Sequence, residues 1–154
     1  MIALLLALLI GVVAGLRAFL APTAVSWAAY LGLLRLDDTW LAFLGYTWTP
    51  WILTLLALVE LVTDQLPATP SRTVPMQFGA RLVMGAAAGA ALGAASGQPL
   101  LGAVAGIVGA VMGTLAGQKA HARMAAAFGR DPPAALIEDA VAIVAALLIV
   151  IAIR

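Results

Sequence analysis

The sequence carries little charge and no cysteine. Charged residues make up 10% of its 154 residues, whereas a soluble domain carries about 25%. Hydrophobic residues make up 64%, and the mean hydropathy is +1.11. This composition predicts an all-α integral membrane protein that lies almost entirely in or on the bilayer. At about 20 residues per span, the length allows roughly four to six helices in a single domain.

The other scarcities exclude whole classes of site. Without cysteine there is neither a disulfide framework nor a thiolate metal site. The single histidine, His121, excludes a multi-histidine metal site. A net charge of +1 gives no signature of nucleic-acid binding. We therefore predict no metal, no cofactor and no nucleic-acid partner. The expected partners are the lipid bilayer and either a second copy of the chain or another membrane protein.

Proline, glycine and hydroxyl residues divide the apolar sequence into five predicted spans. Pro22 ends the first span, because proline lacks a backbone donor and clashes with the preceding turn. Thr49-Pro50 and Asp131-Pro132 have the form of helix starts, and Gly97-Gln98-Pro99 is typical of a tight hairpin. The predicted spans cover residues 2–20, 50–66, 77–96, 100–117 and 134–153, with interfacial or re-entrant helices at 23–34 and 119–129.

Aromatic and basic residues predict how the spans are oriented. All four tryptophans and both tyrosines fall between residues 27 and 51, and their rings prefer the headgroup level. They indicate one membrane face, with aromatic core packing as the alternative. Five basic residues fall on the side of the N-terminus and three on the other, which predicts a cytoplasmic N-terminus in the inner membrane. The five are Arg72, Arg81, Lys119, Arg123 and Arg130; the three are Arg17, Arg35 and Arg154.

Glycines recur at four-residue spacing, which lets helix backbones approach closely in lipid. The predicted result is a tight hairpin of the third and fourth spans, with an extension to a contact between copies of the chain. The alternative is a set of glycines that lines a pore. The ladders are Gly85, Gly89 and Gly93, then Gly102 and Gly106, then Gly109, Gly113 and Gly117.

Two distant segments share a glycine pattern. Gly11 and Gly15 match Gly109 and Gly113 in spacing, and alanines follow at matching distances. The first and fourth spans of a five-span chain run in opposite directions, so the copies would form an inverted-topology repeat. Transporters use such repeats, with the binding site at the repeat interface. Chance similarity between segments rich in alanine and glycine is the alternative.

Two carboxylates stand four residues apart near the end of the second span. Glu60 and Asp64 share one helix face, and a carboxylate in hydrocarbon needs either a partner or a function. Arg17 and Arg81 are the predicted partners. Three interpretations stay open: a buried ion pair, an ion- or proton-coupled site, and a catalytic group.

Depth in the membrane decides how much each acid needs explaining. If the second span begins at Pro50, Glu60 lies about 15 Å along it, near the mid-plane. If residues 40–49 are already helical and buried, Glu60 lies towards the far interface instead. Glu138 and Asp139 fall in the first two turns of the fifth span, where a helix N-terminus favours acids. Both are included in the predicted binding set.

Three stretches resemble a known family. Gly15–Pro22 (GLRAFLAP), Glu60–Pro67 (ELVTDQLP) and the pair Glu138-Asp139 are similar to the bacterial membrane proteins grouped as domain of unknown function 4126. The resemblance implies a multi-span inner-membrane protein and no established activity. The chain departs from the family pattern at Gln65, where a lysine is common, and at residues 68–71, where an acid follows the proline.

The sequence favours a function in transport over one in catalysis. We expect an ion or small solute to pass or bind at Glu60 and Asp64, with Arg17 and Arg81 as partners. The competing hypothesis is a structural or assembly module that packs through its glycine ladders, and a third is a lipid-modifying enzyme. No glycine-rich phosphate loop follows a strand, and His121 lacks the second histidine of a lipid phosphatase. We therefore predict no catalytic residues.

Overall fold

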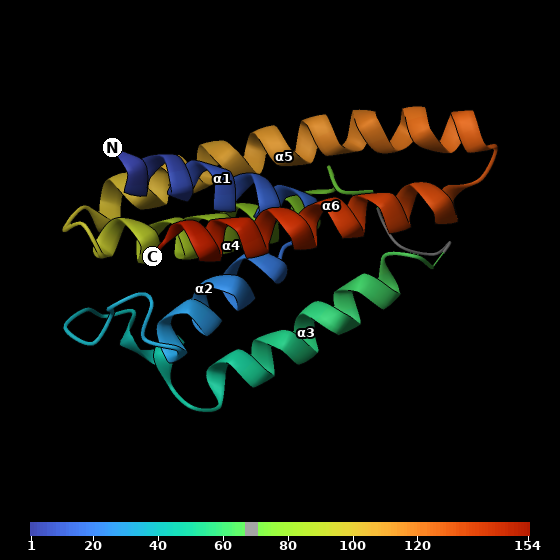
Figure 1. Ribbon diagram of the computed structural model, residues 1–154. Coiled ribbons are helices and arrows are strands. Elements are labelled where there is room, and N and C mark those ends of the chain that lie inside the picture. Colours follow the sequence, from blue (N-terminus) through green and yellow to red (C-terminus); the bar gives the residue numbers. More distant parts are fainter. Residues whose placement is uncertain (67–70) are drawn as a thin grey trace.

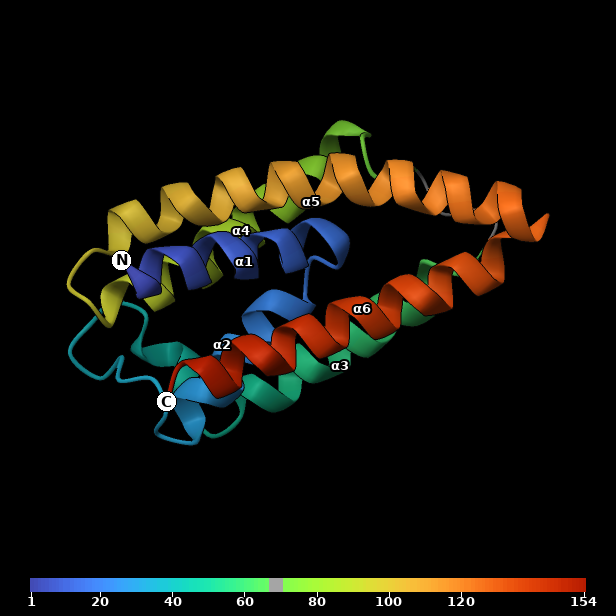
Figure 2. The same ribbon diagram turned by 45° about the horizontal axis from the view of Figure 1, so that its top comes forward.

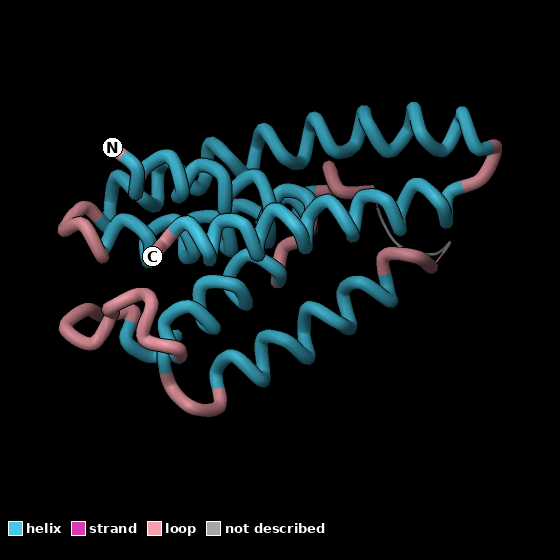
Figure 3. The backbone as a smooth tube through the Cα atoms, in the orientation of Figure 1, coloured by secondary structure: helices cyan, strands magenta, loops and turns pink. Residues whose placement is uncertain are grey.

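The described part of the chain is built from helices. The computed structural model describes residues 1–66 and 71–154, and the loops that join its helices are drawn in pink in Figure 3. Pro67 and residues 68–70, where the family pattern is partly lost, lie outside the described residues. The elements are α1 (Ile2–Leu16), α2 (Leu20–Tyr30), the 3₁₀ helix η1 (Ala42–Gly45), α3 (Thr49–Thr63), α4 (Pro75–Ala94), α5 (Pro99–Phe128) and α6 (Asp131–Ala152).

The helices form two layers. Helices α1, α4 and α5 pack tightly together, and α2, α3 and α6 lie on one side of them (Figure 2). Within the second layer α2 contacts both α3 and α6. Helix α3 packs mainly on α2 and η1 and stands away from the first layer (Figure 1). The tight core is therefore the group of three helices that contains the glycine ladders.

Glycine permits the close approach of α4 to α5. A methyl group at Gly106 would overlap the carbonyl oxygen of Gly85, and one at Gly89 would lie 2.9 Å from the Gly106 Cα. Backbone therefore packs directly on backbone, a geometry that larger residues prevent. All eight ladder glycines are buried: Gly85, Gly89, Gly93, Gly102, Gly106, Gly109, Gly113 and Gly117.

The two segments of the proposed repeat pack against each other. A methyl group at Gly15 would lie 2.7 Å from the Gly113 Cα, and one at Gly11 would overlap Gly106. Later residues of α1 contact later residues of α5, so the two helices run in the same direction (Figure 1). The predicted inverted orientation is therefore wrong. The physical reason is α2, which turns the chain back once more than the five-span count allows.

The first helix ends earlier than predicted. Helix α1 stops at Leu16, and Arg17 is extended, with φ −142° and ψ 112°. Pro22 lies in the first turn of α2, where proline is tolerated because the amide has no helical partner. The break is thus made at Arg17 and not at the proline. Accordingly, the interfacial segment predicted at 23–34 is the helix Leu20–Tyr30.

The predicted fourth span and the interfacial stretch at 119–129 are one helix. Helix α5 is continuous for 30 residues and ends at Gly129, whose φ of 72° is left-handed. Alanine, glutamine and lysine after Gly117 are good helix formers, and nothing there interrupts the backbone hydrogen bonds. By contrast, the helix starts predicted at Thr49-Pro50 and Asp131-Pro132 are confirmed.

The predicted distribution of basic residues between the two ends of the bundle also has to be corrected. The N- and C-termini lie at one end of the bundle, here called the terminal end, and the α5–α6 connection lies at the other (Figure 1). Lys119, Arg123 and Arg130 belong to the last turns of α5 and this connection, so we call it the basic end. The prediction had placed these residues with the N-terminus. The extra reversal at α2 explains the error.

Two helices of the described chain are long and apolar enough to cross a membrane. They are α5, with 30 residues, and α6, with 22. Helices α1 and α3 are apolar but have 15 residues each. The described residues thus form an all-helical fold with two helices of membrane-spanning length, and five spans are more than these helices establish.

The backbone packing of α4 on α5 predicts an asymmetric effect of adding a methyl group. Gly106→Ala should lower the free energy of unfolding by about 1–3 kcal/mol, because the Cβ meets backbone that cannot move aside. Gly79→Ala, in α4 with nothing within 4 Å of its Cβ, should be neutral or stabilising by roughly 0.5–1 kcal/mol. Unfolding in detergent, followed by circular dichroism, measures both. Equal effects would contradict the packing argument.

Candidate functional site

Arg17 joins three helices at the centre of the molecule. Its side chain is 1% exposed. Nη1 donates to Asp64 Oδ2 at 2.6 Å, and Nε donates to Asp139 Oδ1 at 2.6 Å. Asp64 follows the last turn of α3 and Asp139 belongs to α6. A buried arginine held by two carboxylates therefore ties the break after α1 to the ends of two other helices.

Glu60 is bound to the same break by backbone hydrogen bonds. The amides of Ala18 and Phe19 donate to its two carboxylate oxygens at 2.7 and 2.9 Å. These amides precede the first turn of α2 and lack helical partners, and a carboxylate also suits the positive end of a helix. The residues before α3 form only the short η1 turn, so the predicted start near Pro50 stands. Glu60 thus has a direct structural role.

Arg81 closes the other side of the break. Its Nη1 donates to the carbonyl oxygens of Gly15 and Leu16 at 2.6 and 2.7 Å, which are free because α1 ends there. Nη2 lies 3.7 Å from Asp64 Oδ2, beyond hydrogen-bonding distance. Nε is buried and has no hydrogen-bond partner among the described residues. Arg81 is 1% exposed, so this donor has no hydrogen bond to the described residues and little access to solvent.

A second ion pair lies beside the first. Both Nη atoms of Arg72 donate to the carboxylate of Glu138, with Nη2 to Oε2 at 2.5 Å. His121 Nδ1 lies 3.1 Å from Glu138 Oε2. A methyl group at Gly117 would lie 3.2 Å from Arg72 Nη1 and 3.5 Å from Glu138 Oε1. The last ladder glycine therefore makes room for an ion pair as well as for a helix.

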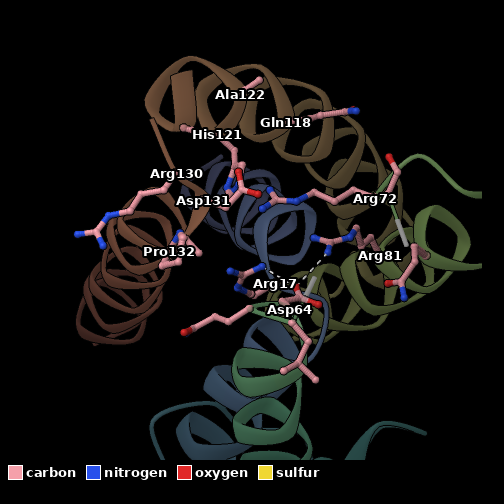
Figure 4. Close-up of a pocket in the computed structure, with 16 residues that line it drawn as sticks. Arg17, Asp64, Arg72, Arg81, Gln118, His121, Ala122, Arg130, Asp131 and Pro132 are labelled. Atoms are coloured by element: carbon pink, nitrogen blue, oxygen red, sulfur yellow. Dashed lines mark hydrogen bonds and ion pairs between the residues drawn. The ribbon is translucent and has the colours of Figure 1, made fainter. Parts of the chain in front are cut away.

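These groups border a cavity of about 770 Å³ at the basic end. Figure 4 shows the side chains of Arg17, Arg72 and Arg81 converging on it from three segments, whereas Arg130 is directed away from them. Glu60, Glu138 and Asp139 do not belong to its lining. The charged and polar lining residues are Arg17, Asp64, Gln65, Ser71, Arg72, Gln77, Arg81, Gln118, His121, Arg130 and Asp131.

Most of the predicted site residues come together, but in a different arrangement. Arg17, Asp64, Arg81 and Asp139 form one cluster, Glu60 holds the adjacent backbone, and Glu138 belongs to the second ion pair. The prediction omitted Arg72, the partner of Glu138, and His121, which lies beside the pair. The rarity of such residues could have indicated them. In a chain with 10% charged residues and a single histidine, each polar side chain of this kind is a candidate for a specific contact. Among the described residues no group of three or more histidine, cysteine, aspartate or glutamate side chains could hold a metal.

Fold and site together define a small all-helical protein that has helices of membrane-spanning length and an internal cluster of arginines and carboxylates. The chain matches the family described as domain of unknown function DUF4126 over residues 4–153 and belongs to it. The resemblance inferred from Gly15–Pro22, Glu60–Pro67 and Glu138-Asp139 is thereby confirmed. No curated protein and no solved structure matches the chain.

The two ion pairs of Arg17 predict that its replacement lowers stability strongly, and that replacing its partners as well restores part of the loss. Arg17→Met should lower the free energy of unfolding by about 3–5 kcal/mol, because the buried Asp139 and the partly buried Asp64 lose their closest counter-charge. Adding Asp64→Asn and Asp139→Asn should restore part of it. Arg35→Met, at an exposed position, is the matched control and should change little. Thermal unfolding in detergent measures all three, and a loss that the aspartate changes deepen would contradict the pairing.

Proposed function

We propose that this protein is a small integral membrane protein that binds a small polar or ionic solute at the basic end and passes it across the membrane. One observation carries the proposal: a cavity of about 770 Å³ with a charged wall, in a chain where 10% of residues are charged. Charged groups inside a membrane protein are costly, and they typically mark the pathways of substrates or ions.

A multi-pass position in the inner membrane is part of this proposal. It is supported by the composition, by the lengths of α5 and α6, and by the apolar surface of α3. Of that helix only Pro50 and Ala57 are buried, and exposed leucine, isoleucine, valine and tryptophan cover the rest. By the positive-inside rule the basic end faces the cytoplasm. The N-terminus, at the opposite end of the bundle, is then external.

The carboxylates act in this proposal as supports for the arginines. Asp64 and Asp139 bind Arg17, and Glu60 binds backbone amides. The sequence suggested that a solute contacts Glu60 and Asp64 directly. Of the two, only Asp64 lines the cavity, and its Oδ2 is 2.6 Å from Arg17. We therefore propose that the carboxylates hold Arg17 and the break after α1 in place. We call this part of the cavity wall its floor.

Helix α3 is the element that we propose to move when a solute passes. It makes few contacts outside α2 and η1, and segments with little burial open at low free-energy cost. Its C-terminal end carries Glu60 and the adjoining Asp64, which hold the break after α1. Moving this end would release Arg17 and open the floor of the cavity towards the terminal end.

A structural or assembly module is the second candidate. It is favoured by the fact that Glu60, Asp64, Glu138 and Asp139 all have partners, so none of these carboxylates needs a ligand. Against it, the ladder glycines are occupied inside the chain and leave no glycine surface for another copy. A flux measurement separates the two candidates.

Flux through proteoliposomes tests the proposed function. Wild-type protein should speed the osmotic swelling of vesicles in at least one of potassium phosphate, potassium acetate, potassium chloride, lysine hydrochloride and glycerol. Asp64→Asn should raise that rate by about tenfold or more, because it weakens the hold on Arg17, whose release opens the floor of the cavity. Glu60→Gln should act in the same direction, and Asp38→Asn, at an exposed position, should not. Swelling no faster than that of empty vesicles in every solute would reject passage.

A further inference from the structure

We infer that the solute carries a phosphate group, which binds between Arg81 and Arg72 at the wall of the cavity. This inference deepens the proposed function, on which it rests. It starts from the sign of the wall. Four arginines and two aspartates give the lining a formal charge of +2 with His121 neutral. Asp131, with its side chain 83% exposed, and Arg130, which is also exposed, lie at the rim. Without these two the remaining three arginines and Asp64 give the same formal charge of +2.

The acids that balance the arginines lie behind them. Glu138 binds Arg72, and Asp139 binds Arg17, yet neither acid reaches the lining. The arginines are thereby fixed in place while their cavity-facing surfaces stay free of carboxylate. Asp64 is the exception, and its Oδ2 is already bound to Arg17 at 2.6 Å. Such a wall attracts an anion and repels a cation.

Arg81 supplies the strongest indication of a ligand. It is 1% exposed, and only Nη1 makes hydrogen bonds, both to the carbonyl oxygens that end α1. Nε and Nη2 form the other edge of the guanidinium group. Among the described residues Nε has no hydrogen-bond partner, and Nη2 has the ion pair with Asp64 Oδ2 at 3.7 Å. This edge is the fork that binds two oxygens of one phosphate or carboxylate. An unused fork on a buried arginine is costly unless a ligand completes it.

The surroundings favour phosphate over carboxylate. A carboxylate offers two oxygens and one fork satisfies it, whereas the cavity brings together three guanidinium groups, those of Arg17, Arg72 and Arg81 (Figure 4). A phosphate monoester has three free oxygens and up to two charges. The N-terminal turns of α4 and α6 also reach the lining, through Gln77 and Pro132, and the positive end of a helix stabilises phosphate.

The size and polarity of the cavity indicate what the phosphate is attached to. A volume of about 770 Å³ exceeds what inorganic phosphate fills and matches a small organic molecule. Gln65, Ser71, Gln77 and Gln118 line it with neutral donors and acceptors that suit hydroxyl groups. The ligand class is therefore a phosphate ester of a small polyol. It can come from water as a free ester or from the bilayer as a lipid headgroup.

The test is calorimetric titration of the protein in phosphatidylcholine nanodiscs. Glycerol 3-phosphate should bind with higher affinity than malonate, and glycerol should not bind. Nanodiscs that also contain phosphatidate separate the two sources: a lipid ligand lowers the apparent affinity for glycerol 3-phosphate by competition, and a free ester leaves it unchanged. Binding of malonate as tight as that of glycerol 3-phosphate, or no binding of glycerol 3-phosphate with no effect of phosphatidate on stability, overturns the inference.

Two variants link the binding to the cavity. Arg81→Lys removes the fork and should weaken binding of glycerol 3-phosphate by about tenfold or more. Because this arginine also holds α1, a second variant is needed. Gln118→Glu breaks no side-chain hydrogen bond of the described residues and adds a negative charge to the wall. It should weaken binding by about tenfold, whereas Gln98→Glu, at the exposed terminal-end turn, should not. Equal affinities of the two glutamate variants would reject the cavity as the site.

The outcomes also separate this inference from the proposed function. If vesicles swell in glycerol or potassium chloride while glycerol 3-phosphate does not bind, passage stands and the phosphate assignment fails. If glycerol 3-phosphate binds and no vesicle swells, the binding site stands and passage fails.

Discussion

The structure depends on a break in a helix that three carboxylates hold open. Between Leu16 and Leu20 the chain leaves the helical path, and carboxylates bind the groups exposed there. Asp64 and Asp139 bind Arg17, and Glu60 binds two amides. Arg81 takes the carbonyl oxygens on the other side. Buried backbone groups without partners are costly, so the break depends on these side chains.

Everything after the break inherits its consequences. It shortens α1 to 15 residues and turns α2 back, and the directions of the later helices follow. Helix α5 then runs beside α1 in the same sense, so the glycines of both helices face each other at backbone distance. The ionic cluster and the glycine contacts are thus two parts of one arrangement. The cluster sets the path of the chain, and the glycines let the helices close on it.

The sequence predicted where helices start and which charged residues lie close together, but it did not predict the directions in which the helices run. Helix starts at Thr49 and Asp131 follow from local chemistry, which one sequence contains. That Arg17 and Arg81 lie close to Asp64 follows from the cost of unpaired charge. The break at Arg17 could not be predicted, because it needs Glu60, a residue 43 positions away, to bind the released amides. Because the reversal of the chain at α2 was not predicted, both the relative orientation of the two repeat segments and the assignment of basic residues to the two ends were wrong.

The unequal lengths of α1 and α5 set the depth at which the cavity lies. The contacts of α1 with α5 reach Gly117, whereas α5 continues to Phe128, about 16 Å further at 1.5 Å per residue. The whole of α5 measures about 45 Å, against a hydrocarbon core of about 30 Å. The cavity follows this extension, through Gln118 and His121. In the membrane arrangement that we propose, the cavity is therefore a vestibule at headgroup level, which a solute would enter without crossing hydrocarbon, with the barrier to passage at its floor.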